Sequence, residues 1–222
     1  KNNFMKYTLI TGASSGLGKE FAIQCAKAGR AIIIFALPGS NAGYLANDLA
    51  FEFGVNVKVF EFDLTDNNEL IKHAQFVIEN FEIDFLINNA GIGGTSSITE
   101  TAMERIDQII QLNVRSTALL THLLLPHLIK NANSFILNVS SMAAFTPIAY
   151  KTVYPASKAF ISSFSLGLRE ELAGTGVSVS VLYPGPIMTN SNTTRRIILQ
   201  GKKGRMGLLS TAKIAHIALQ KT

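Results

Sequence analysis

The chain has 222 residues, of which 47% are hydrophobic and 16% charged, and this composition supports one substantial buried core. Its longest apolar stretches, such as Ala31–Leu37, are far shorter than the roughly 20 residues that a membrane-spanning helix needs. Its single cysteine, Cys25, excludes an intrachain disulfide. We therefore expect a cytoplasmic protein of one domain, residues 1–222, in which Cys25 is an inert core residue.

The net charge of +5 comes largely from one segment. Between Asn190 and Ser210 there are five cations and neither an acid nor an aromatic residue. A nucleic-acid-binding face interleaves cations with aromatic side chains that stack on bases, so we expect no nucleic-acid partner. The segment is typical of a solvated loop; attraction of an anionic substrate or a cofactor phosphate is the alternative.

Short apolar runs typical of strands alternate with segments of helical period along the chain, and no linker or repeat interrupts them. The expected strands are Tyr7–Ile10, Ala31–Ala36, Val57–Glu61, Phe85–Asn88, Ser134–Val139 and Val177–Tyr183. The expected helices are Gly16–Ala28, Ala42–Phe53, Asn67–Phe81, a long region reaching His127, Tyr154–Ala173 and Thr211–Gln220. This alternation predicts a single Rossmann-like α/β domain, a doubly wound parallel sheet with helices on both faces. In such a fold ligands bind where the strands end.

A glycine-rich turn follows the first expected strand, with the spacing G-x-x-x-G-x-G. Glycines at these positions permit a tight strand-to-helix turn and let the backbone approach a pyrophosphate at the helix N-terminus. A glycine-rich turn without a ligand is the alternative, although the strand–turn–helix context favours dinucleotide binding. The expected cofactor-binding residues here are Gly12, Ser14, Ser15, Gly16, Leu17 and Gly18.

The loop after the second strand bears on which dinucleotide binds. Ala36–Ser40 contains no acid that would bind the adenosine ribose and repel a 2′-phosphate, which slightly favours NADP over NAD. The same segment has no Arg or Lys to bind that phosphate, so both cofactors stay open.

Two further loops are expected to border a cofactor. Asp63, followed by Leu64, can meet the adenine amino group or simply cap the next turn. Asn88, Asn89, Ala90 and Gly91 end the fourth strand, where small residues let the backbone approach the cofactor and side-chain amides can brace the central strands.

The strongest chemical signal is a tyrosine and a lysine one helical turn apart. Tyr154 and Lys158 share a face at the start of a helix, thirteen residues after Ser141, which ends the fifth expected strand. Carbonyl reduction needs a proton donor, and the ordinary tyrosine pKa of about 10 is high for that role. We expect the Lys158 ammonium to lower the pKa of Tyr154, and Ser141 to hold the substrate oxygen. Asn113 either disturbs its helix and holds a water near Lys158, or satisfies local backbone groups.

Together these residues resemble the short-chain dehydrogenase/reductase family over Lys6 to about Ala218. The resemblance implies that Asn113, Ser141, Tyr154 and Lys158 form a catalytic tetrad and that Lys158 also binds the nicotinamide ribose. It implies that Asp63 and Asn89 border the adenosine, and that the motif after the sixth strand holds the nicotinamide carboxamide. That motif contributes Pro184, Gly185, Ile187 and Thr189.

The resemblance also implies a homodimer or homotetramer assembled through the helices that carry Asn113 and Tyr154. One departure concerns the seventh strand that the family usually has. The sequence ends after the last expected helix, so either the sheet is shorter or further residues follow.

The expected activity is NAD(P)(H)-dependent interconversion of a carbonyl compound and an alcohol. Residues 190–210 are expected to form a lid. Apolar residues near the motifs suggest an apolar substrate, although core packing explains several of them: Met142, Ala143, Phe145, Ala149, Tyr150 and Met188.

Two rival functions remain open on the sequence: an NAD(P)-binding sensor or scaffold without turnover, and a non-redox epimerase or dehydratase on the same fold. A metal site is not expected, because the four histidines show no ligand spacing. The Gly-x-Ser-x-Gly string of nucleophilic hydrolases is also missing.

Overall fold

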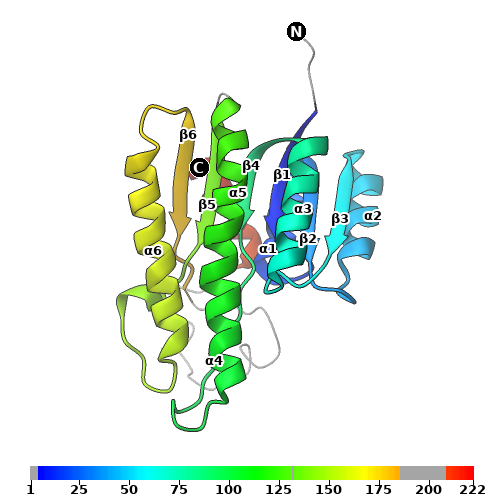
Figure 1. Ribbon diagram of the computed structural model, residues 1–222. Helices are drawn as coiled ribbons and strands as arrows, with labels where there is room; N and C mark the ends of the chain where they lie inside the picture. Colours follow the sequence, from blue (N-terminus) through cyan, green and yellow to red (C-terminus); the bar gives the residue numbers. More distant parts are fainter. Residues whose placement is uncertain (1–4, 132, 186–208) are drawn as a thin grey trace.

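The described part of the chain folds as a six-stranded parallel sheet in the order β3-β2-β1-β4-β5-β6. Figure 1 shows this arrangement. The structure is a computed structural model that describes residues 5–131, 133–185 and 209–222. Because all strands run parallel, their carboxyl ends share one edge of the sheet. The strands are β1 (Lys6–Thr11), β2 (Ala31–Ala36), β3 (Val57–Glu61), β4 (Glu82–Asn88), β5 (Ser134–Val139) and β6 (Val177–Leu182).

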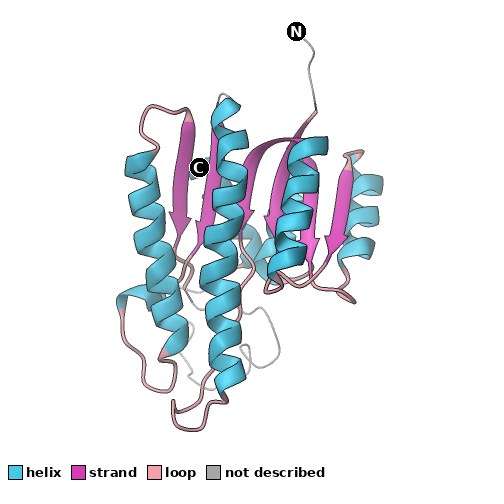
Figure 2. Cartoon of the chain, in the orientation of Figure 1, coloured by secondary structure: helices cyan, strands magenta, loops and turns pink. Residues whose placement is uncertain are grey.

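Helices cover both faces of the sheet (Figure 2). One face carries α1 (Gly16–Lys27), α2 (Ala42–Phe53) and α9 (Thr211–Lys221). The other carries α3 (Asn67–Asn80), α5 (Ser116–Lys130) and α6 (Val153–Glu171). Each helix layer packs its apolar stripe on the sheet, which gives one hydrophobic core per face. The predicted doubly wound α/β fold is confirmed.

The long helical region differs from the prediction. It consists of α4 (Met103–Ile110), a π-helical turn η1 (Gln111–Arg115) and α5, which follow one another directly. A further 3₁₀ turn, η2 (Met142–Phe145), was not predicted. Strand β4 begins at Glu82 rather than Phe85, because the polar residues at its start pair with β1 although they break the apolar run.

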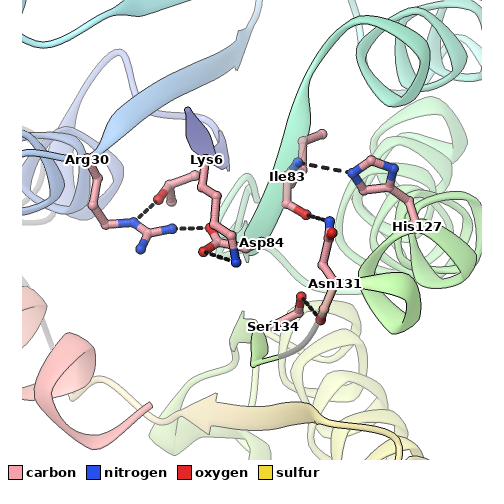
Figure 3. A network of polar contacts seen from close by, with 8 residues as sticks. Lys6, Arg30, Ile83, Asp84, His127, Asn131 and Ser134 are labelled. Carbon is pink, nitrogen blue, oxygen red and sulfur yellow. Dashed lines mark hydrogen bonds and ion pairs between the residues drawn. The ribbon is translucent and has the colours of Figure 1, made fainter. Parts of the chain in front are cut away.

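The amino ends of the central strands are closed by a polar network (Figure 3). Arg30, between α1 and β2, pairs with the buried carboxylate of Asp84 on β4 and donates to the Thr8 hydroxyl at 2.6 Å. On the other face, His127 Nε2 accepts the backbone N–H of Ile83 at 3.0 Å. These contacts fix the loops at the amino ends of the strands. The candidate site lies at the opposite edge, where the strands end.

The structure also describes the surroundings of Cys25, the length of the helices and the grouping of possible metal ligands. Cys25 is buried, and burial raises the pKa of its thiol to about 11, which suits an inert core residue. Within the described ranges, no helix combines the length and apolar character needed to cross a bilayer. The described residues also hold no cluster of three or more His, Cys, Asp or Glu side chains suited to a metal ion.

Candidate active site

The glycine-rich turn between β1 and α1 is built on close backbone packing. Gly12 has a φ of +69° and Gly16 of +56°, conformations that side chains other than glycine rarely adopt. A Cβ on Gly12 would lie 2.9 Å from Ala90 Cα, and one on Gly18 would lie 2.9 Å from the Gly12 carbonyl carbon. The N-cap Ser15 makes no side-chain capping bond, so the first N–H groups of α1 are available to an anion.

Two side chains tie this turn to the loop after β4. The Thr11 hydroxyl accepts the N–H groups of Asn89 and Ala90, both at 3.0 Å. The Asn89 amide donates back to the carbonyls of Thr11 at 2.9 Å and Gly12 at 3.1 Å. Asn89 therefore holds the turn through both its side chain and its backbone N–H.

The amide of Asn88 braces the central strands, which is one of the two expectations for this motif. Its Nδ2 donates to Asn138 Oδ1 on β5 at 2.8 Å and to the Thr121 hydroxyl on α5 at 3.0 Å. All three residues are buried.

The loops after β2 and β3 lie at the same edge of the sheet. Asp63 is exposed, and its Oδ1 accepts the N–H and the hydroxyl of Thr65, both at 2.8 Å, so it does cap the following turn. Its neighbour Leu64 is buried in the core. Leu37 at the end of β2 is 59% exposed, leaving an apolar surface where a selector of the cofactor would lie.

Tyr154 lies in the first turn of α6 and Ser141 two residues beyond the end of β5, as the N-cap of η2. The Ser141 hydroxyl accepts the Ala143 N–H at 3.1 Å. The Tyr154 ring packs on the loop after β4, where a Cβ on Gly93 would lie 3.3 Å from ring atom Cδ2. Burial raises the pKa of Tyr154, and the side chain of Ser141 lowers it by less. This direction is opposite to the expected one.

Lys158 is buried, with 5% of its surface exposed, one turn after Tyr154. Its Nζ donates to the Val139 carbonyl at 2.7 Å, so in this structure the ammonium binds the end of β5. Desolvation lowers the Lys158 pKa to about 8. A Cβ on Gly91 would lie 3.4 Å from Lys158 Nζ, which shows that the lysine reaches the same loop as the Tyr154 ring.

Asn113 occupies the centre of the π-helical turn and is buried. Its Oδ1 accepts the N–H of Ile92 at 2.9 Å, and its Nδ2 donates to the Ile92 carbonyl and to the Ser157 hydroxyl, both at 2.9 Å. Asn113 thus satisfies nearby backbone groups from within a π-helical turn, and the water near Lys158 stays a prediction. A π-turn of this kind is frequent at functional sites.

The loop after β6 is described only at its start. Pro184 is buried, and its carbonyl accepts the Met142 N–H at 3.0 Å, joining this loop to the one that bears Ser141. Gly185 follows at intermediate exposure. The expected contributions of Ile187, Met188 and Thr189, and nearly all of the expected lid, lie outside the described residues.

The sequence interpretation missed three side chains that hold the site. They are Thr11, Ser140, whose hydroxyl donates to the Lys158 carbonyl at 2.7 Å, and Ser157. All three are small, polar and at most 4% exposed. In the sequence, these three residues could have been recognised only by their position beside the motif residues in otherwise apolar elements.

These features define a dinucleotide-type α/β fold with a Ser–Tyr–Lys group at the carboxyl ends of the strands. The short chain dehydrogenase family matches residues 6–197, and the chain belongs to this family of oxidoreductases that act on CH–OH and C=O groups.

Individual proteins agree with this assignment. The chain is 37% identical over 189 residues to serine 3-dehydrogenase of Agrobacterium fabrum, covering 84% of this chain and 74% of that protein. A short-chain dehydrogenase from Sphingobium yanoikuyae in complex with NADPH matches with a TM-score of 0.87 and 28% identity, over 97% of this chain and 83% of that one. A 3-ketoacyl-(acyl-carrier-protein) reductase from Brucella melitensis complexed with NADH matches with a TM-score of 0.81 and 30% identity, over 96% and 89%.

Proposed function

We propose that this protein is an NAD(P)(H)-dependent oxidoreductase that interconverts a carbonyl compound and an alcohol, with Tyr154 as the proton donor. One observation carries the proposal: Tyr154 and Lys158 both reach the Gly91–Gly93 loop at the carboxyl end of β4. The side chain of Ser141 acts on the same phenol, because it lowers the pKa of Tyr154. A proton donor, a hydrogen-bond donor and a buried amine therefore meet beside the glycine-rich turn.

The cofactor is NADP or NAD. The close glycine packing at Gly12 and Gly18 and the uncapped N-terminus of α1 fit a pyrophosphate. Asp63 would border the adenine, and the backbone of Ala90 and Gly91 the ribose and nicotinamide half. When bound, the nicotinamide supplies or accepts the hydride. The similar structures hold NADPH in one case and NADH in another, which supports this class of cofactor.

The proton chemistry follows from the two perturbed groups. Because burial raises its pKa, Tyr154 is a neutral phenol at pH 7 and carries the proton that reduction needs. The side chain of Ser141 lowers the pKa of Tyr154 and so stabilises the phenolate left after that proton is transferred. Lys158, with a pKa of about 8, can give up and regain a proton near neutral pH, so it suits the return of a proton to Tyr154. Asn113 holds the loop on which both side chains converge.

The substrate side is apolar. Met142, Phe145 and Tyr150 are 53%, 60% and 64% exposed on the segment between Ser141 and Tyr154. Large apolar side chains exposed together beside a reacting group favour a ligand that covers them. We therefore propose an apolar ketone, aldehyde or secondary alcohol as substrate.

The remaining parts of the proposal concern the whole protein. A homodimer or homotetramer would form through the outer faces of α5 and α6, where Phe160 and Leu166 are exposed. A cytoplasmic location is consistent with a single, buried cysteine.

The test is a panel of apolar carbonyl compounds assayed with NADPH and NADH in parallel, using the wild type and Tyr154→Phe. We expect Tyr154→Phe to lower kcat by about 100-fold or more while cofactor binding, measured by calorimetry, changes little. Tyr44→Phe, on the exposed surface of α2, is the matched control and should keep full activity. Unchanged turnover in Tyr154→Phe would refute the role of the phenol. Cofactor binding without reduction of any compound would instead favour the sensor.

A further inference from the structure

The first turn of α6 lacks the support that helix starts usually have. Its N-cap, Thr152, makes no side-chain capping bond. Pro155 does not weaken this turn further, because an N–H in the first turn would have had no helical partner. An uncapped first turn frays easily. Tyr154, the proposed proton donor, nevertheless lies in this turn and must be held at a fixed position to react.

A chain of side-chain hydrogen bonds reaches the carbonyl side of this turn. Asn113 Nδ2 donates to the Ser157 hydroxyl at 2.9 Å, and that hydroxyl donates to the Tyr154 carbonyl at 2.7 Å. Ser157 is 4% exposed and Asn113 1% exposed, so water competes little for these bonds. The backbone of Tyr154 is thereby tied to the π-helical turn.

The same asparagine also fixes what the tyrosine ring rests on. Asn113 binds both the N–H and the carbonyl of Ile92, and the next residue, Gly93, packs against the Tyr154 ring. One amide therefore holds the loop beneath the ring, and Ser157 connects that amide to the helix turn that bears the ring.

We propose that Ser157 is a positioning residue: its hydroxyl links the Asn113 amide to the Tyr154 carbonyl and sets where the phenol stands over the Gly91–Gly93 loop. The inference rests on the proposed function for its catalytic consequence. The link itself is a property of the fold.

A second copy of this arrangement on the same helix provides a matched control. Ser165 donates to the Ile161 carbonyl at 2.6 Å and accepts from Asn138 Nδ2 at 3.0 Å, and it is fully buried. The hydrogen bonds have the same chemistry as those of Ser157: an Asn amide donates to a Ser hydroxyl, and that hydroxyl donates to a carbonyl of α6. Ser165 lies two turns further along, where the chain anchors α6 to β5 and holds no proposed reacting group.

The experiment compares Ser157→Ala, Ser157→Thr and Ser165→Ala with the wild type. We expect Ser157→Ala to lower kcat by about 10-fold or more with KM changed less than about three-fold, because the phenol is misplaced while the binding surfaces persist. Threonine keeps a hydroxyl that can bond a helix carbonyl, so Ser157→Thr should recover most of kcat. Ser165→Ala should lose comparable thermal stability and keep kcat.

Hydrogen–deuterium exchange supplies a measurement that needs no substrate. Ser157→Ala should speed exchange in the peptide covering 153–160, and Ser165→Ala should leave that peptide unchanged. The inference is overturned if 153–160 stays equally protected in Ser157→Ala, or if the two alanine variants lose kcat equally. The proposed function fails separately, if the wild type reduces no carbonyl compound or Tyr154→Phe keeps its turnover.

Discussion

Lys158 places a titratable amine in a buried position, and this has a measurable effect on stability. Its pKa is lowered from 10.5 to about 8 because burial disfavours the ammonium. Below pH 8 the group is charged in the folded and unfolded chains, so the cost of burying the charge is fully present. As pH rises from about 8 to 10.5 the folded chain loses the proton first, and stability rises by about 3 kcal/mol.

We therefore predict that the wild type gains stability relative to Lys158→Met over this pH range. The measurement is urea unfolding of both proteins at pH 7.5, 8.5, 9.5 and 10. Lys58→Met, at an exposed position on β3, is the control and should track the wild type at every pH. A constant difference between Lys158→Met and the wild type would show that the lysine titrates normally.

At the residue scale, the sequence predicted correctly which groups lie together, but it did not predict the direction of their pKa shifts. The spacing of Tyr154 and Lys158 was enough to place both on one face of a helix. The sign of the Tyr154 shift was not predictable, because burial depends on loops from β4 and β5 that pack on the ring. For the same reason Ser157 received no role: its partner Asn113 is distant in sequence.

At the scale of elements, the turn between β1 and α1 depends on the absence of one side chain. A Cβ on Gly18 would clash with the backbone of Gly12 and with the Asn89 amide, which itself holds the turn. Neither partner is the free end of a flexible side chain. Gly18→Ala must therefore displace α1 from the loop after β4.

We predict that Gly18→Ala lowers stability by about 2 kcal/mol or more and weakens cofactor binding at least about ten-fold. Gly43→Ala, in the first turn of α2 with nothing within 4 Å of the added Cβ, is the matched change. It should raise stability by roughly 0.5 kcal/mol. Urea unfolding and calorimetric titration with NADPH measure both effects. Equal behaviour of the two variants would contradict the packing argument.

Elements with a simple period were predictable and the irregular ones were not. The buried run of β2 and the helix over Ala42–Phe53 agree with the sequence prediction at both ends. The π-helical turn was not predicted from the apolar spacing. Asn113 was its only visible sign.

At the scale of the whole molecule, the amino and carboxyl ends of the strands differ in what they carry. The amino ends are pinned by Arg30–Asp84 and His127–Ile83, and the carboxyl ends carry the turn, Ser141 and the start of α6 (Figures 1 and 3). Parallel strand order explains this division, because every strand delivers its following loop to one edge. The sequence predicted that edge as the site from strand–helix alternation alone.

The outer face of α6 carries exposed apolar side chains. On α6, Phe160 and Leu166 are 39% and 47% exposed, and the Phe160 ring stacks on Phe164 with centroids 5.7 Å apart. Helices α5 and α6 lie on the same face of the sheet (Figure 1). Two copies meeting through the same surface would bury these rings in a closed, isologous contact.

We predict that Phe160→Glu converts the proposed homodimer to monomers, because a two-fold contact would place two carboxylates together without partners. Sedimentation velocity over a range of protein concentrations measures the mass. Tyr44→Glu, at a 76% exposed position of α2 on the opposite face, should leave the assembly unchanged. A wild type that sediments as a monomer, or a Phe160→Glu variant of wild-type mass, would show that this face is not the interface.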